Sequence, residues 1–129
     1  MAVLDTCTLI WLTSQRESIS PKAMKVLEST SDLWISAMTV IEIHRLLRAG
    51  RLEFQMKERD LEPWLEAVME DFSIQCQSIT REIAHRSETL PWHHKDPADR
   101  MIVATAQILD QPLITPDRLI AQYAVKTIW

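Results

Sequence analysis

Glycine is almost absent from this chain of 129 residues, which has one glycine, at position 50. Phosphate-binding loops of the Walker and Rossmann kinds need several glycines, because their backbone must approach the phosphates closely. The sequence therefore excludes both kinds of nucleotide site.

Cysteine is also scarce, with only Cys7 and Cys76 in the chain. Small secreted domains have a higher density of cysteines, so we expect two thiols in a reducing compartment. The apolar start, "MAVLDTCTLIWL", is too short and too interrupted for a membrane span. No basic segment precedes it, as one would in a signal peptide. We therefore expect a cytoplasmic protein that makes no membrane contact.

The length and the hydrophobic content of 47% predict one domain over residues 1–129, with one core. The formal charge of −4, from 14 basic and 18 acidic residues, excludes a polycation that coats nucleic acid. It does not exclude nucleic acid as a substrate, because two bound divalent ions would bring the charge to about zero.

Short apolar runs alternate with helical patterns along the chain. Strands are predicted at 2–5, 33–36, 72–78, 112–115 and 126–129, with 72–78 near a sheet edge. Helices are predicted at 8–13, 21–29, 39–49, 54–71 with a break near Pro63, 80–88 and 98–109. This alternation predicts the α/β class, as a three-layer α/β/α sandwich around a short, mainly parallel sheet. Ligands of such sheets bind beyond the carboxyl ends of the strands.

Four acidic residues stand where these elements begin or end. Asp5 closes the first strand, Glu42 lies in the helix 39–49, Asp99 opens the helix 98–109, and Asp117 follows the strand 112–115. Carboxylates that converge repel each other unless cations neutralise them. Their hard oxygen atoms select Mg²⁺ or Mn²⁺. The pattern therefore predicts an acidic metal site, which could hydrolyse phosphodiester bonds.

Each acid also has a purely structural interpretation. Asp5 and Asp117 could cap the helices that follow them, and Asp96 could cap the helix that begins at Pro97. Glu42 could pair with Arg45, three residues further along the same helix. The metal-site interpretation depends on all four acids occurring together.

Asp99 favours the metal site through its place on the helix. Although an acid in the first turn suits the helix dipole, we predict that the exposed strip of this helix is formed by Arg100, Ala104 and Gln107. Asp99 would then lie on the covered side, where a carboxylate needs a partner.

Other reactive side chains give weaker signals. His93 and His94 lack a second cluster with zinc-ligand spacing, so we interpret them as part of a polar loop. Cys7 has no motif partner and is interpreted as a buried thiol. The remaining candidates form a basic row at every third position: Arg45, Arg48 and Arg51. This row could complement the dipole at the helix end, or it could contact RNA phosphates or an acidic partner segment.

Four stretches resemble motifs of the PIN-domain family, in particular its VapC-type toxins: "VLDTCTLIWL", "ISAMTVIEIHRLLRAGRLEF", "LPWHHKDPADRMIVATAQ" and "LITPD". The resemblance covers the chain from residue 2 to its end. It departs from the family pattern at Ile41, Cys7 and Ala98, and keeps every carboxylate.

The resemblance implies an endoribonuclease that depends on Mg²⁺ or Mn²⁺ and is the toxin of a type II toxin–antitoxin pair. Its catalytic acids would be Asp5, Glu42, Asp99 and Asp117, and its metal ligands would be Asp5, Asp99 and Asp117. Arg100 would hold a loop or the substrate. It is one of four residues that would support the site: Thr6, Asp96, Arg100 and Thr115.

The resemblance also implies RNA as substrate, a separate antitoxin chain as inhibitor, and a homodimer. Two alternatives stay open, namely a PIN-fold nuclease acting on DNA or structured flaps, and a PIN-like scaffold without activity. A phosphotransfer receiver is a poorer match, since the segments "VLDT" and "KTIW" lack its second acid and its lysine.

Overall fold

Five short parallel strands form a sheet whose carboxyl ends lie at one edge. The computed structural model describes residues 1–52 and 54–129. The strands are β1 (Ala2–Leu4), β2 (Leu33–Ser36), β3 (Ile74–Gln77), β4 (Leu113–Ile114) and β5 (Thr127–Ile128). The helices are α1 (Thr6–Ser14), α2 (Pro21–Ser29), α3 (Ala37–Arg48), α4 (Leu61–Asp71), α5 (Arg81–Thr89) and α6 (Pro97–Leu109). Three short 3₁₀ segments are η1 (Arg16–Ser18), η2 (Glu58–Asp60) and η3 (Ile120–Gln122). Glu53, within the second family-like stretch, lies outside the described residues.

The sheet has the order β3-β2-β1-β4-β5, and each pair of neighbours is parallel. β1 lies at the centre, where Val3 is in register with Trp34 of β2 and Leu113 of β4. β3 is an edge strand, as its alternating sequence predicts. The α/β class and the parallel sheet are therefore confirmed.

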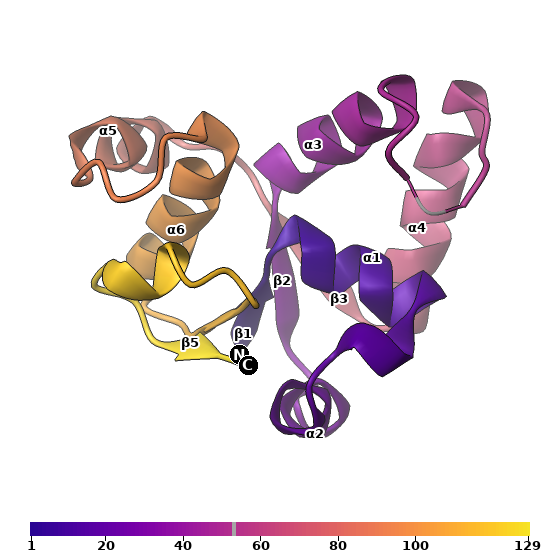
Figure 1. The fold of residues 1–129 in the computed structure, drawn as a ribbon, viewed down its shortest axis with the longest axis horizontal. Coiled ribbons are helices and arrows are strands. Elements are labelled where there is room, and N and C mark those ends of the chain that lie inside the picture. Colours follow the sequence, from indigo (N-terminus) through magenta and orange to yellow (C-terminus); the bar gives the residue numbers. More distant parts are fainter. Residues whose placement is uncertain (53) are drawn as a thin grey trace.

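Helices cover both faces of the sheet (Figure 1), with α5 and α6 on one side and α1, α2, α3 and α4 on the other. Side chains of a strand alternate between the two faces. Ala2 and Leu4 accordingly pack with the larger cluster under α1 to α4, whereas Val3 packs with the cluster under α5 and α6. Covered on both sides, the inner strands β1 and β4 are wholly apolar.

Local capping signals predict several helix boundaries correctly. Ser20 accepts a hydrogen bond from the Ala23 N–H at the start of α2, and Thr80 accepts one from Ile83 N–H at the start of α5. Gly50 follows α3 with φ of 66°, a conformation that favours glycine. α3 begins two residues earlier than predicted because Ser36 caps it, accepting from the Met38 N–H.

The prediction for residues 54–71 is partly wrong. The α-helix begins only at Leu61, after η2, and Pro63 does not break it. Pro63 lies in the first turn, where a backbone N–H has no partner within the helix and proline is tolerated. No helix within the described residues has the length and apolar character needed to cross a membrane.

Candidate active site

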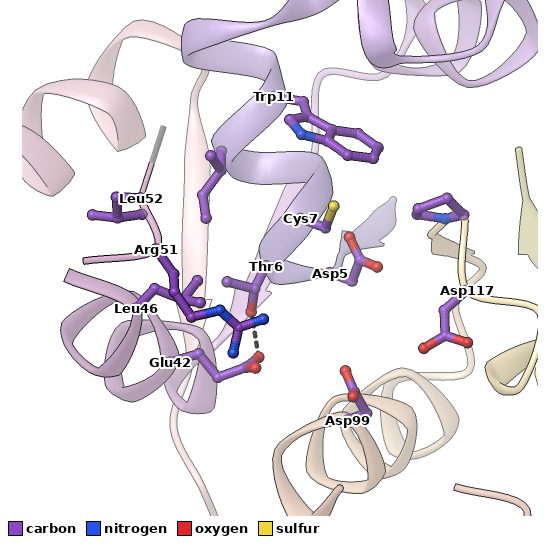
Figure 2. Close-up of a pocket in the computed structure, with 12 residues that line it drawn as sticks. Asp5, Thr6, Cys7, Trp11, Glu42, Leu46, Arg51, Leu52, Asp99 and Asp117 are labelled. Atoms are coloured by element: carbon purple, nitrogen blue, oxygen red, sulfur yellow. Dashed lines mark hydrogen bonds between the residues drawn. The ribbon is translucent and has the colours of Figure 1, made fainter. Parts of the chain in front are cut away.

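The four predicted acids line one pocket of about 400 Å³ at the carboxyl edge of the sheet. Asp5 follows β1, Glu42 comes from α3, Asp99 from the first turn of α6, and Asp117 from the loop after β4. Figure 2 shows these carboxylates around a common space, with Asp99 and Asp117 facing Asp5 from the opposite wall. The structure thus brings together residues separated by more than 100 positions in the sequence.

Asp5 is buried, with 5% of its surface exposed, and both carboxylate oxygens are engaged. Oδ1 accepts from the Thr8 N–H at 2.7 Å, which makes Asp5 the N-cap of α1. Oδ2 accepts a short hydrogen bond from the Thr115 hydroxyl. Burial raises the pKa of Asp5 above its usual value and the charge of Asp117 adds to this, whereas the bonds from Thr115 and Thr8 oppose it. Capping and site geometry therefore coexist in this residue.

Glu42 is held by Thr6 and not by Arg45. The Thr6 hydroxyl lies 2.5 Å from Glu42 Oε1 and 3.2 Å from the Thr39 hydroxyl, which joins the start of α1 to α3. Within the described residues no ion pair joins Glu42 to Arg45, although the charge of Arg45 slightly lowers the pKa of Glu42. Burial outweighs this effect and the Thr6 bond, so the pKa of Glu42 is raised.

Asp99 lies among several other acidic side chains of the pocket. Its pKa is raised to about 8, first by burial and then by the charges of Glu42, Asp96 and Asp117. At neutral pH and without a cation, this carboxyl group would hold its proton. A divalent ion in the pocket would favour the ionised form, because it offsets the repulsion among the acids.

His94 is a site residue that the sequence analysis missed. Its Nε2 lies 2.9 Å from Asp117 Oδ2 and 3.1 Å from Asp99 Oδ2. The sequence analysis interpreted His94 as part of a polar loop, although it lies in the family-like run before α6. Tertiary folding, which places the loop 90–96 beside the loop after β4, creates the contact.

Two groups of three residues place their potential ligand atoms within 4.8 Å of one another: His94, Asp99 and Asp117, and Glu42, Asp96 and Asp99. Asp99 belongs to both groups, and five of the six members are carboxylates, counting Asp99 twice. Asp5 lines the same pocket but belongs to neither group found among the described residues. This set of oxygen donors suits a hard divalent cation.

Two predicted supporting residues take distinct positions. Asp96 caps α6, its Oδ1 accepting from the Ala98 N–H at 2.9 Å. Arg100 is 2% exposed, so the predicted exposed strip of Arg100, Ala104 and Gln107 is wrong, and Ala104 is fully buried. Because α5 packs on this face of α6, Arg100 donates from Nε and Nη2 to the Ser87 carbonyl and from Nη2 to the Leu90 carbonyl. It is placed to hold the loop before α6.

The basic row lies mostly outside the pocket. Arg45 and Arg48 are exposed, and Arg48 pairs with Glu58 at 3.2 Å. Arg51 lines the pocket and points toward its acidic part (Figure 2). Cys7 is a half-buried thiol on the pocket wall, not the fully buried one predicted. An apolar wall completes the pocket, formed by Ile10, Trp11, Leu46 and Leu52.

The sequence profile of the PIN domain matches residues 2–126. The chain belongs to the PIN-domain family. A protein of Mycobacterium tuberculosis named Ribonuclease VapC22 is 27% identical over 117 residues, which cover 90% of this chain and 86% of that protein.

Two solved structures have similar folds. A toxin–antitoxin complex from Klebsiella pneumoniae contains a chain with a TM-score of 0.68 and 27% identity, covering 96% of this chain and 93% of that one. The structure named FitAcB from Neisseria gonorrhoeae has a TM-score of 0.64 and 19% identity, covering 98% and 96%, and it supports the fold alone.

Proposed function

We propose that this PIN domain is an endoribonuclease that depends on Mg²⁺ or Mn²⁺, and that residues 1–129 act as a single domain. The observation that supports this most is the convergence of Asp5, Glu42, Asp99 and Asp117 on one pocket, with raised pKa values for the first three. A protein gains no stability from such mutually repelling carboxylates, and a bound cation would relieve them.

RNA is the proposed substrate class because the relative from Mycobacterium tuberculosis is named a ribonuclease and most of both chains align. Arg51 stands at the pocket beside the acids, where a guanidinium could contact a substrate phosphate. Arg48 and Arg45 lie three and six residues before it and are exposed, so they could extend this contact along the RNA or toward a partner.

The proposed metal ligands are Asp5, Asp99 and Asp117, with Glu42 either binding metal or orienting water. A bound divalent ion would supply an activated water and neutralise charge that develops on the phosphate. The chain's own contribution is orientation: Thr6 holds Glu42, and Thr115 holds Asp5 and accepts from the Asp117 N–H. Both threonine contacts fix carboxylates before substrate arrives.

We further propose that the protein is the toxin of a toxin–antitoxin pair, in the cytoplasm, with a separate chain as its inhibitor. The toxin–antitoxin complex from Klebsiella pneumoniae supports this through its 27% identity and nearly complete coverage. A homodimer is part of the proposal, as it is for VapC-type toxins in general.

The direct test is cleavage of total cellular RNA by purified protein without antitoxin, in Mg²⁺, in Mn²⁺ and in EDTA. We expect discrete fragments with either metal and none in EDTA. Asp5→Asn and Asp99→Asn should each remove the fragments, because each loses an anionic ligand while keeping the side-chain shape.

Asp71→Asn is the matched control, since it removes one exposed carboxylate that precedes β3, at the opposite edge of the sheet. It should cleave as the wild type does. Equal cleavage by wild type and both site variants would assign the activity to a contaminant. Cleavage of DNA but not RNA by the wild type would favour the DNA nuclease instead.

A further inference from the structure

His94 joins the two acidic elements on one side of the pocket. Asp99 lies in the first turn of α6 and Asp117 lies in the loop after β4, and both carboxylates reach the same imidazole nitrogen. The side chains of His94 and Asp99 are 14% and 21% exposed, so little water competes for these contacts. His94 therefore sets the relative positions of two proposed metal ligands.

The other ring nitrogen determines where the imidazole carries its proton. The backbone N–H of Asp96 donates to His94 Nδ1 at 3.1 Å. An atom that accepts from an N–H cannot itself carry a hydrogen in that direction, so Nδ1 is unprotonated and the proton is on Nε2. The Nε2–H then donates to the Asp117 carboxylate, and Asp99 Oδ2 lies 3.1 Å from the same nitrogen.

The main chain at His94 is fixed from a third direction. The Tyr123 hydroxyl accepts from the His94 N–H at 2.9 Å and donates to the Pro91 carbonyl at 2.8 Å. The neighbouring ring of His93 contacts the edge of Tyr123, with 5.0 Å between ring centroids. Tyr123 is itself buried in the core under α5 and α6. The loop therefore holds the imidazole in place without help from a ligand.

A ring in this state organises the acids without neutralising them. An imidazolium would offset the carboxylate charge and so compete with a metal ion for the pocket. To ligate a metal through Nε2, the neutral ring would need its lone pair on Nε2 and its proton on Nδ1. That proton would face the Asp96 N–H. The hydrogen bond from the Asp96 N–H disfavours both the imidazolium and this metal-binding tautomer.

We infer that His94 is a positioning residue, which holds Asp117 through its Nε2–H and contacts Asp99 with the same nitrogen, and so keeps both acids in place at the metal site without binding the metal. The inference rests on the proposed function for the presence of the metal. The hydrogen-bond geometry alone carries the assignment of the proton.

The test uses the full-length protein and two variants with different donor capacity. His94→Gln keeps an N–H donor at a similar reach, and His94→Leu keeps the bulk without a donor. We expect His94→Leu to weaken binding of Mn²⁺ and of Mg²⁺ by about 10- to 100-fold, the usual range for residues that orient ligands. The affinity ratio of the two ions should not change, and His94→Gln should restore most of the affinity.

Nitrogen NMR of histidine-labelled protein gives the second readout, with the His94 signals assigned by their loss in His94→Gln. We expect the Nε2–H form both without metal and with saturating Mg²⁺. A proton on Nδ1, loss of the Nε2 proton on adding Mg²⁺, or a selective loss of Mn²⁺ affinity in His94→Leu would overturn the inference, because each indicates a metal ligand. If the wild type bound no divalent ion yet kept the Nε2–H form, the proposed function would fail while the link between the carboxylates would stand.

Discussion

Replacing Asp99 by Asn should stabilise the metal-free protein at neutral pH, although it removes a proposed metal ligand. The pKa of Asp99 rises from 3.8 to about 8 in the folded chain. Between these values the folded state binds more protons than the unfolded state, so the free energy of unfolding falls as pH rises. The burial and repulsion that raise this pKa are therefore unfavourable to folding throughout this range.

The magnitude follows from the distance between pH 7 and the ordinary pKa. Each pKa unit corresponds to about 1.4 kcal/mol, so roughly three units give an upper limit of about 4 kcal/mol. The Asp99 side chain is 21% exposed and its neighbours are also ionisable, so solvent and shared protons reduce the effect. We expect about 2 kcal/mol, or several degrees in melting temperature. Asn keeps the shape of the side chain and carries no charge.

The assay is thermal unfolding of wild type, Asp99→Asn and Asp71→Asn in EDTA, from pH 4 to pH 8. The advantage of Asp99→Asn should be largest near pH 8 and should become small near pH 4, close to the ordinary pKa of 3.8, where much of the unfolded state also binds the proton. Saturating Mg²⁺ should reverse the order, since binding to the folded state stabilises the wild type more. An Asp99→Asn protein that melts below wild type at pH 7 in EDTA would refute the reasoning.

Three further substitutions test the supporting contacts. Thr115→Val should lower kcat/KM by about 10- to 100-fold because it leaves a buried oxygen of Asp5 without its donor, and Thr115→Ser should restore most activity in the same RNA assay. Arg100→Met should lower the free energy of unfolding in urea by about 3 kcal/mol, since two carbonyls lose their donor, and an unchanged midpoint would contradict its role in holding the loop. Gly50→Ala should lower the free energy of unfolding in urea by only about 1 kcal/mol, because φ is 66° but no atom lies within 4 Å of the added carbon. A larger loss of stability would indicate a steric clash and contradict this account.

Local chemistry explains which parts of the fold the sequence predicts well. The Ser20–Pro21 start of α2, the Thr80 cap of α5 and the glycine after α3 depend on neighbouring backbone groups, and the structure has each of them. Buried strands are predictable for a similar reason, since short apolar runs between turns have few other options. The carboxyl-edge rule for parallel sheets then places Asp5 and Asp117 near each other.

Contacts between distant elements explain what the sequence does not predict. A charged Arg100 in a helical pattern suggests an exposed position, but α5 packs over it and supplies carbonyl acceptors from Ser87 and Leu90. His94 meets Asp117 only because Tyr123 and the loop after β4 lie beside it. Neither arrangement leaves a periodic signal in the sequence, since each depends on tertiary packing.

The central claim is that the acids at the carboxyl edge of the sheet form one divalent-cation site. Calorimetric titration of Mn²⁺ into wild type, Asp99→Asn and Asp71→Asn tests it most directly. The account predicts saturable binding by wild type and by Asp71→Asn, and binding at least about tenfold weaker in Asp99→Asn. Equal binding by all three proteins, or none by the wild type, would contradict it.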